Sequence, residues 1–441
     1  MKKEIKRKSI CAGTKNRRTF LKQILLMAAG PMIVAPSVLG KGGSVAPSER
    51  VGVGIIGFGE RAESVLESFL ALPDIQLRAV CDCRQSRMIL GSERINRHYG
   101  NKDCIKKEDF RELLAQPGID AVYIAMGMRW NGMASVYSAR AGKDIYCETP
   151  ISLSMHEANV VREVCKRYGT IYQGGTWRRS SKVYQFVRRM IQEGRIGKLQ
   201  KVEMQIWSGG AIVPETPQEV PTGWNWDMWL GQAPWRDYTP AFANGGWNYF
   251  WDTAGGMMTD IGTHYIDLMQ WIAGLDNEMP IEFSGTGELP DPRLFASQTP
   301  LTGEWSCRYD NGLEGGMHQR DEFAKRSLSF TGEEGWIRVA EHTGEVLSAP
   351  ESLLRLRPAA ETEKESFEAH LRDFINCVRT RRHPVSDSIS AVNGMRTAQA
   401  WNFALRLGRT LRWDNVGNRF KDVVANRMMY CQPRGGWSLQ G

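Results

Sequence analysis

Asp260 and His264 have side chains and a spacing that could perform proton transfer. They lie four residues apart in "TDIGTHYID", and positions four apart share one face of a helix. A carboxylate there could orient the imidazole and favour its protonated form. Such a pair can take or return a hydroxyl proton while hydride leaves the same carbon. The alternative is that Asp260 caps the helix and His264 is a packed core histidine. A zinc site is less favoured, because no third ligand is evident.

A glycine turn, "GFGERA" at residues 57–62, follows an apolar run and precedes a helical pattern. Gly57 permits the tight turn, Gly59 lets the backbone approach a pyrophosphate, and Ala62 lets the helix lie close to the strand. The free amides at the helix start would then face the phosphates. An ordinary glycine turn is the structural alternative. The predicted dinucleotide-binding residues of the turn are Gly57, Phe58, Gly59, Glu60 and Arg61.

Asp82 closes the next predicted strand, "IQLRAVCDC". A carboxylate there can accept hydrogen bonds from a ribose diol and would repel a 2′-phosphate. The position therefore favours NAD as the cofactor. Arg84 and Arg87 are close in sequence and keep NADP open as the alternative.

An aromatic segment, residues 221–256, is the third candidate for a binding role. Its rings could stack on the apolar faces of a sugar, or could pack on one another and on a neighbouring subunit. Stacking on single-stranded nucleic acid is disfavoured, because the rest of the chain lacks a basic groove. The rings in question are Trp224, Trp226, Trp229, Trp235, Trp247, Tyr249, Phe250 and Trp251.

The elements that would position these groups follow two patterns. Across residues 51–175, short apolar strands alternate with amphipathic helices, which predicts a doubly wound parallel sheet of the Rossmann type. Across residues 176–441, alternating strands separated by glycine turns predict an α+β domain with a large, mostly antiparallel open sheet. Two helices within 367–408 are expected to return and pack on the first domain. The fold class is therefore α/β.

The N-terminal segment, residues 1–40, resembles a twin-arginine export signal, with "NRRTFLKQ" before an apolar run. That run is too short for a comfortable span, so no stable membrane span is expected in the mature form, although an anchor is the alternative. A linker at 41–50 follows. The net charge of +8 comes from this segment, which holds nine Lys or Arg and only Glu4 as an acid, and nucleic-acid binding is therefore not expected. We expect a periplasmic, exported protein.

The order of several motifs resembles the Gfo/Idh/MocA oxidoreductases, the group of glucose-fructose oxidoreductase and inositol dehydrogenase. The matching stretches include "GIIGFGERA", "AVCDC", "AGKDIYCETPISLS", "QGGTWRRS" and "GGMMTDIGTHYIDLMQW". The resemblance implies an NAD-binding Rossmann domain and a second domain whose sheet often forms homo-oligomers. It implies that Asp260 and His264 are catalytic and that Glu148 lies near the nicotinamide ribose. It also places Ala125, Met126, Asn131, Trp177 and Arg178 at the cofactor site.

Two residues depart from the family pattern. Thr149 stands in "CETP" where the family carries a catalytic lysine, and Asn131 stands where histidine is common. A lysine supplies positive charge and a movable proton, whereas threonine supplies one neutral hydroxyl. Losing a positioned acid/base group costs about 10²–10⁴ in rate. Arg178, Arg179 or the aromatic segment could supply the missing charge.

Three functions remain open on the sequence alone. The first is an exported NAD-dependent oxidoreductase acting on a sugar or sugar derivative, with His264 as the acid/base group. The second is a redox-neutral glycosidase or lyase that oxidises a ring carbon transiently. The third is a non-catalytic carbohydrate-binding relative, because Thr149 replaces the usual lysine. No metal is expected.

Overall fold

The computed structural model describes residues 46–322, 325–341, 343–359 and 361–440. The predicted export signal at 1–40 and the first half of the predicted linker lie outside the described residues. Residues from Val51 onward form one compact unit. Within the described ranges, no helix is both long and apolar enough to cross a membrane.

The first sheet has six strands, all parallel, in the order β3-β2-β1-β4-β5-β6. Every residue of β1 is buried, as expected where helices cover both faces of a parallel sheet. The strands are β1 (Val51–Ile56), β2 (Ile75–Cys81), β3 (Ile105–Lys107), β4 (Ala121–Ile124), β5 (Asp144–Cys147) and β6 (Tyr172–Gly174). The helices that connect them are α2 (Glu60–Leu70), α3 (Gln85–Tyr99), α4 (Phe110–Leu114), α5 (Met128–Arg140) and α6 (Met155–Tyr168). The predicted Rossmann topology is confirmed, and its strand order reverses between β1 and β4, where such sheets bind ligands.

The second sheet has nine strands, in the order β13-β12-β11-β7-β10-β9-β8-β14-β15. Only β7 and β10 pair in parallel among the named pairs, so the predicted mostly antiparallel sheet is confirmed. Trp305 and Cys307 of β9 are buried, while the alternating residues Glu304, Ser306 and Arg308 are exposed. The strands are β7 (Leu199–Trp207), β8 (Glu282–Glu288), β9 (Thr302–Arg308), β10 (Glu314–Arg320), β11 (Ser327–Gly332), β12 (Trp336–Ala340), β13 (Glu345–Ala349), β14 (Leu411–Asp414) and β15 (Arg419–Phe420).

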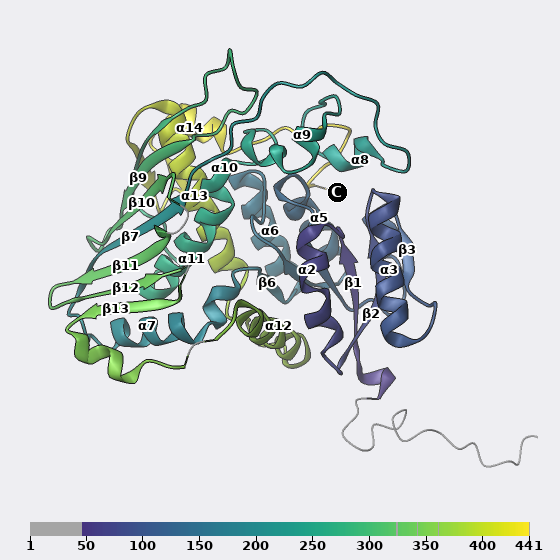
Figure 1. Ribbon diagram of the computed structural model, residues 1–441, viewed down its shortest axis with the longest axis horizontal. Helices are drawn as coiled ribbons and strands as arrows, with labels where there is room; N and C mark the ends of the chain where they lie inside the picture. Colours follow the sequence, from purple (N-terminus) through teal and green to yellow (C-terminus); the bar gives the residue numbers. More distant parts are fainter. Residues whose placement is uncertain (1–45, 323–324, 342, 360, 441) are drawn as a thin grey trace, which may run out of the picture. The chain divides into compact units, whose positions relative to one another are not determined.

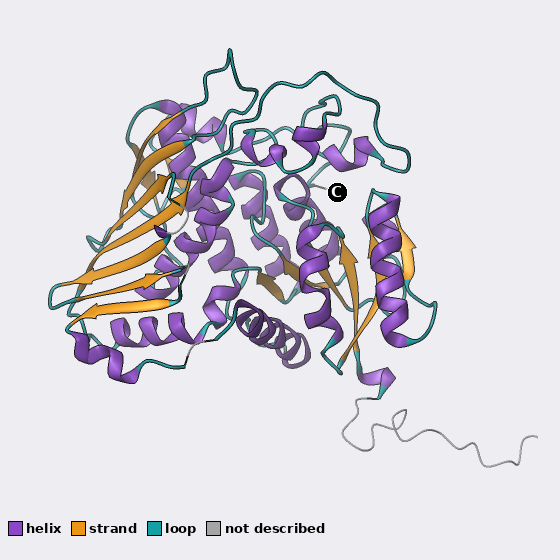
Figure 2. Cartoon of the chain, viewed as in Figure 1, coloured by secondary structure: helices purple, strands orange, loops and turns teal. Residues whose placement is uncertain are grey.

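Helices cover the inner face of the second sheet and join it to the first (Figures 1 and 2). The helices on the second sheet are α7 (Lys182–Gln192), α11 (Ile261–Ala273) and α13 (Ser388–Leu407), while α12 (Glu363–Thr380) packs on the first sheet. Phe367 and Phe374 of α12 lie in the core that holds the α2 side of the first sheet. Val392 at the start of α13 belongs to the core on the sheet's other side, and Trp401 near its end belongs to the core of the second sheet. The two sheets are thus fixed to each other by one continuous helix.

The aromatic insert, residues 221–256, contains only short elements: α8 (Trp226–Leu230), α9 (Pro240–Ala243) and η4 (Gly246–Tyr249). Figure 1 shows it passing above α5, near the mark for the C-terminus. Arg434 holds α8 from the far end of the chain. Its guanidinium donates to the Asp227 carboxylate and to the carbonyl oxygens of Asp227, Gly231 and Ala233. The remaining described elements are η2 (Pro47–Glu49), η3 (Trp177–Ser180), α10 (Gly256–Thr259), η6 (Glu351–Leu356) and α14 (Val423–Met428).

Candidate active site

One cavity of about 560 Å³ lies at the carboxyl ends of β1, β2, β4 and β5. Its wall includes residues from the first sheet, from the aromatic insert and from the segment just before α11. A ligand there would therefore contact both halves of the fold. The sequence-predicted residues in its wall are Gly57, Gly59, Glu60, Arg61, Asp82, Ala125, Met126, Asn131, Glu148, Thr149 and Asp260.

The glycine turn has the form that a pyrophosphate needs. Gly57 has φ +88, and a Cβ there would lie 2.6 Å from the Ala125 carbonyl oxygen. A Cβ added at Gly59 would meet nothing within 4 Å, so the space beside it is open. Among the described residues no side chain caps α2, which leaves its first amides for a ligand. The Phe58 side chain is buried in the core and contributes only its backbone to the turn.

Asp82 is held at the end of β2 by two backbone amides. Its Oδ2 accepts from Phe58 N at 2.7 Å, and its Oδ1 accepts from Arg84 N at 2.7 Å. Burial raises the pKa of the carboxyl, and the two amides oppose that rise. The nearby guanidinium groups are engaged elsewhere: Arg84 lies 3.7 Å over the Trp224 ring, and Arg87 pairs with Glu63 at 2.7 Å. The site therefore fits a ribose diol better than a 2′-phosphate.

Glu148 and Asn131 fix the loops that follow β5 and β4. Glu148 Oε1 accepts from Arg61 Nε at 2.9 Å and from the Tyr123 hydroxyl at 2.8 Å. Asn131 Oδ1 accepts from Met126 N at 3.0 Å, and its Nδ2 donates to the carbonyls of Glu148 and Pro150 at 3.0 and 2.9 Å. With no exposed surface, Asn131 acts through these bonds to hold the two loops together.

Thr149 and His264 meet at the far end of the cavity. Thr149 Oγ1 lies 3.1 Å from His264 Nε2, and Thr149 forms part of the wall. Within the described residues, His264 Nδ1 has no hydrogen-bond partner. Burial lowers the pKa of His264 well below its usual value, and the charges of Arg178 and Arg61 add to that effect. The imidazole is therefore neutral at neutral pH, with Nε2 directed at the Thr149 hydroxyl.

Asp260 does not have the role that its spacing suggested, which was to orient the His264 imidazole. Its Oδ2 accepts from Asn248 Nδ2 at 2.9 Å, and burial raises the pKa of the carboxyl to about 6. The prediction that Asp260 favours the protonated form of His264 is wrong, because burial outweighs any such stabilisation. The alternative of a helix cap also fails, since Asp260 stands at the N-cap of α11 without a side-chain capping bond. The carboxyl instead faces the cavity.

Trp177 and Arg178 lie outside the wall of the cavity, which differs from their predicted place in the nicotinamide pocket. Arg178 is buried and donates to both oxygens of Glu341, at 2.7 and 3.0 Å, with its guanidinium 4.5 Å over the Trp177 ring. Arg179 pairs in the same way with Asp267 and Asp276. Both guanidinium groups are thus paired with carboxylates far away in the sequence. The charge of Arg178 still acts on His264, but neither arginine lines the cavity.

The rings of the insert mostly pack on one another, as the structural alternative predicted. Trp226 and Trp229 stack at 4.5 Å with an angle of 10° between their planes, inside a small core of their own. Only Trp229 and Trp247 among the predicted rings reach the cavity wall. Sequence reasoning missed Arg129 and Trp130, which also line it. Arg129 lies in the first turn of α5, two residues after the positive-φ Gly127, and nothing in its sequence neighbourhood indicates a role.

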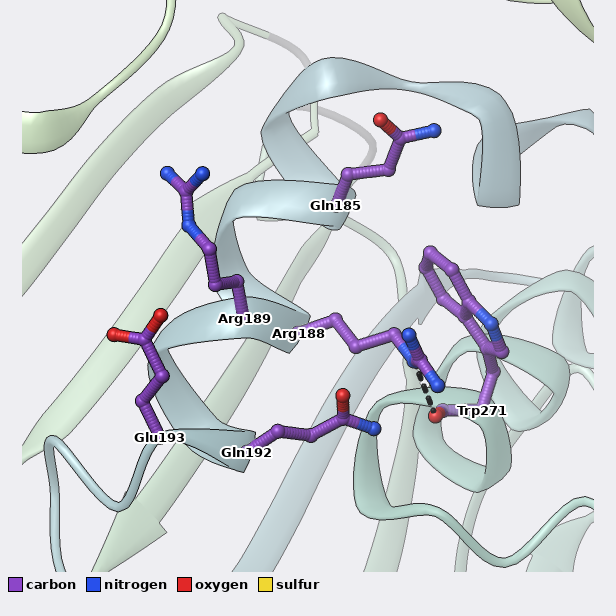
Figure 3. A pocket seen from close by; sticks show the side chains of 6 residues that line it. All are labelled: Gln185, Arg188, Arg189, Gln192, Glu193 and Trp271. Atoms are coloured by element: carbon purple, nitrogen blue, oxygen red, sulfur yellow. Dashed lines mark hydrogen bonds between the residues drawn. The ribbon is translucent and has the colours of Figure 1, made fainter.

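A second hollow, of about 300 Å³, lies between α7 and Trp271 of α11 (Figure 3). Arg188 crosses it and donates from Nε to the Trp271 carbonyl at 3.2 Å. None of the predicted site residues lines it. In the ranges that the structure describes, no group of three or more His, Cys, Asp or Glu side chains could hold a metal ion.

Comparison with known proteins places this geometry in a family. Residues 51–176 match the model of the oxidoreductase family's NAD-binding Rossmann fold, and residues 188–314 match that of its C-terminal alpha/beta domain. The chain belongs to the Gfo/Idh/MocA oxidoreductase family, and the prediction of an NAD-binding Rossmann domain is confirmed.

Two relatives and one solved structure are similar to this chain. The scyllo-inositol 2-dehydrogenase (NAD(+)) of Bacillus subtilis (strain 168) is 25% identical over 378 residues, covering 82% of this chain and 95% of that protein. A glycosyl hydrolase family 109 protein of Shewanella sp. (strain ANA-3) is 30% identical over 160 residues, covering 32% of this chain and only 35% of that protein. The structure of the WlbA dehydrogenase from Bordetella pertussis, solved with NADH and UDP-GlcNAcA, superposes with a TM-score of 0.62 at 16% identity over 83% of this chain and 99% of that one.

Proposed function

We propose that the protein is an NAD-dependent dehydrogenase that oxidises a secondary alcohol on a ring polyol, either a sugar or an inositol. The observation that carries the proposal is the contact between Thr149 Oγ1 and His264 Nε2, 3.1 Å, at the wall of the cavity that also holds the dinucleotide residues. The inositol dehydrogenase relative, which matches over most of both chains, supports this substrate class.

NAD, when bound, supplies the acceptor for the hydride of the carbinol carbon. Side chains of the protein accept the proton of the substrate hydroxyl and return it in the reverse reaction. A substrate hydroxyl that donates to Thr149 Oγ1 allows the threonine proton to pass to His264 Nε2, which is neutral and open. Because burial and two arginines disfavour the imidazolium, it returns its proton readily when the carbonyl is reduced. Asp260, with a pKa of about 6, faces the same cavity as a second proton acceptor.

The test is a substrate screen with the purified protein. NAD and a panel of inositols and free sugars are supplied, and NADH formation is followed by absorbance. We expect net NADH with at least one ring polyol and a matching ketone product by mass spectrometry. Absence of NADH with every compound, together with normal NAD binding, would contradict the dehydrogenase proposal.

A redox-neutral glycosidase is the second candidate, favoured by the hydrolase relative and by Thr149 in place of lysine. A ring hydroxyl would be oxidised to a ketone, the acidified neighbouring C–H would lose its proton as the glycosidic oxygen leaves, water would add to the alkene, and the ketone would be reduced again. Hydrolysis of an aryl glycoside that needs NAD but accumulates no NADH, with solvent deuterium entering beside the oxidised carbon, would select this function. NAD binding without either activity would favour the third function, a non-catalytic carbohydrate-binding protein.

Two further parts of the proposal concern location and assembly. We expect export through the twin-arginine pathway on the basis of Arg17 and Arg18 and the apolar run after them. Replacing both by Lys should retain the protein in the cytoplasm in a fractionation assay. We also expect a homo-oligomer through the open face of the second sheet, which light scattering on the purified protein tests.

A further inference from the structure

Arg129 is a buried cation at the wall of the cavity, and it has no anionic partner among the described residues. It lies at the start of α5, is 5% exposed, and its Nη1 has no hydrogen-bond partner among the described residues. Its Nε donates to the Trp229 carbonyl at 2.7 Å. Its guanidinium lies 3.8 Å from the Trp229 ring centre and 4.7 Å from that of Trp247. Two indoles of the insert thus hold a planar guanidinium in place.

The charge of Arg129 is not neutralised by a neighbouring acid. Within the part of the chain that the structure describes, it forms no ion pair, and burial lowers its pKa to about 9. The other groups that act on its charge are Cys83, Arg84 and Asp82, of which only Asp82 is a carboxylate, already occupied by two backbone amides. An unpaired buried charge is costly. A ligand that accepts hydrogen bonds would offset that cost.

The insert is fixed to the end of β2, where the adenosine ribose is bound in this fold. Arg84 and Trp224 form a β-bridge, Gln85 N donates to the Gly223 carbonyl at 2.8 Å, and Asn225 N donates to the Cys83 carbonyl at 2.9 Å. Trp130 Nε1 also donates to the Met228 carbonyl at 2.7 Å. The residues just after Asp82 therefore bind the insert directly. Arg129 lies near the same residues, because its charge interacts with Cys83, Arg84 and Asp82.

We propose that Arg129, held by Trp229 and Trp247, binds the adenine base of NAD, so that the aromatic insert completes the cofactor site. The turn at Gly57 and Gly59 serves the pyrophosphate and Asp82 serves the ribose, which leaves the base for the next residues along the wall. Adenine offers ring-nitrogen acceptors in its plane, and Nη1 of Arg129, which has no hydrogen-bond partner among the described residues, can donate to one of them. The inference rests on NAD binding and not on the proposed substrate.

Binding measurements without substrate test it. Affinities for NAD, for ADP-ribose, which keeps the adenosine, and for nicotinamide mononucleotide, which lacks it, are measured by calorimetry on the whole protein. We expect Arg129→Met to lower the affinities for NAD and ADP-ribose by about 10- to 100-fold and to leave the affinity for nicotinamide mononucleotide unchanged. Unchanged NAD affinity, or equal weakening of the mononucleotide, would overturn the proposal. The latter result would assign Arg129 to the nicotinamide or substrate end.

A matched control lies in the same insert. Arg236 stacks over Phe250 at 4.2 Å and pairs with Asp252, away from the cavity wall, so Arg236→Met should leave all three affinities unchanged. If Arg129→Met fails to fold, Arg129→Lys, which keeps the charge and loses the planar fork, decides the question by the same three ligands. Failure of the dehydrogenase proposal would show in the substrate screen and would leave these affinities unaffected.

Discussion

The hydroxyl of Thr149 contacts the imidazole of His264 at 3.1 Å, across a sequence separation of 115 residues. Thr149 follows the last residue of β5 by two positions, and His264 lies in the first turn of α11. The contact therefore joins the dinucleotide sheet to the helix that covers the second sheet. Of the two residues, Thr149 lines the cavity and His264 does not.

Thr149→Val removes this hydroxyl while keeping the shape of the side chain. We expect turnover to fall by about 10²-fold or more, because a substrate hydroxyl loses its route to the imidazole. Thr149→Ser keeps the hydroxyl and should retain most of the rate. Steady-state kinetics on the accepted substrate measure both, and equal activities of the two variants would exclude a relay through Thr149.

Thr149→Lys, which restores the family residue, provides a separate test of the departure. The new ammonium would approach an imidazole whose pKa is already lowered by burial and by the charges of Arg178 and Arg61. If the rest of the ancestral site is intact, dehydrogenase activity should rise. An activity that does not rise would indicate that the site is adapted to the threonine.

His264→Ala should lower turnover by about 10²- to 10⁴-fold, since the proton would have no acceptor behind Thr149. Nucleotide binding should be unchanged, because His264 lies outside the wall where the dinucleotide residues gather. His318→Ala on β10 is the matched control, since that histidine is partly exposed on the second sheet. Comparable rates for the two variants would remove His264 from the mechanism.

The pH dependence of oxidation should reflect Asp260 and not His264. A histidine with a strongly lowered pKa stays neutral across the usual range, so it sets no limb near its ordinary value. Asp260 becomes protonated as pH falls through about 6, and the rate should fall there if its carboxylate accepts the proton. Asp260→Asn should remove this limb from the profile of kcat/KM. A limb that persists in the variant would contradict the assignment.

Asp82→Ala should lower the affinity for NAD by about 10-fold and reduce the ratio of the affinity for NAD to that for NADP. The carboxylate that accepts from a ribose diol and repels a 2′-phosphate would be gone, while Arg84 and Arg87 would remain. Affinities for the two nucleotides, measured side by side, give the ratio. A ratio equal to that of the unmodified protein would show that Asp82 does not contact the ribose.

Glu157 provides a prediction on stability. It is buried at the start of α6, accepts from Leu153 N at 2.6 Å and Gln232 Nε2 at 2.7 Å, and burial raises its pKa from 4.5 to about 7. Because the folded-state pKa is the higher one, its contribution is fully present below pH 4.5 and is lost as pH rises through 7, which amounts to about 3 kcal/mol.

Glu157→Gln should therefore show a smaller loss of unfolding free energy between pH 5 and pH 8, measured by urea titration at both values. Glu163→Gln, on an exposed position of the same helix, is the control. Parallel losses in the two variants would contradict a raised pKa at Glu157.

The two sheets, and the glycine turn and acid that form the dinucleotide site, could be predicted from local sequence patterns. Alternating burial, glycine turns and the acid after β2 are all properties of short stretches, and the structure confirms both sheets. What could not be predicted depends on residues far apart in the chain. Arg178 pairs with Glu341 at a separation of 163 residues, and that pairing engages a guanidinium that the sequence left available.

Asp260 and His264 show a second limit. Their spacing correctly places them one turn apart, yet whether they interact depends on Asn248, which takes the Asp260 carboxylate, and on how deeply the imidazole is buried. The position of Arg129 in the cavity wall could not be predicted for the same reason. A single arginine at a helix start reveals nothing until the two indoles around it are known.

Arg434 makes four hydrogen bonds, two to Asp227 of α8 and one each to Gly231 and Ala233 just after it, and they have a consequence for the order in which the molecule folds. Asp227 and Arg434 are separated by 207 residues, so this contact closes a long loop whose entropy cost is met late. We therefore expect the insert to settle onto the first sheet after both sheets have formed. Local opening should then begin at α8, and amide protons of Trp226–Leu230 should exchange with solvent well before those of β1.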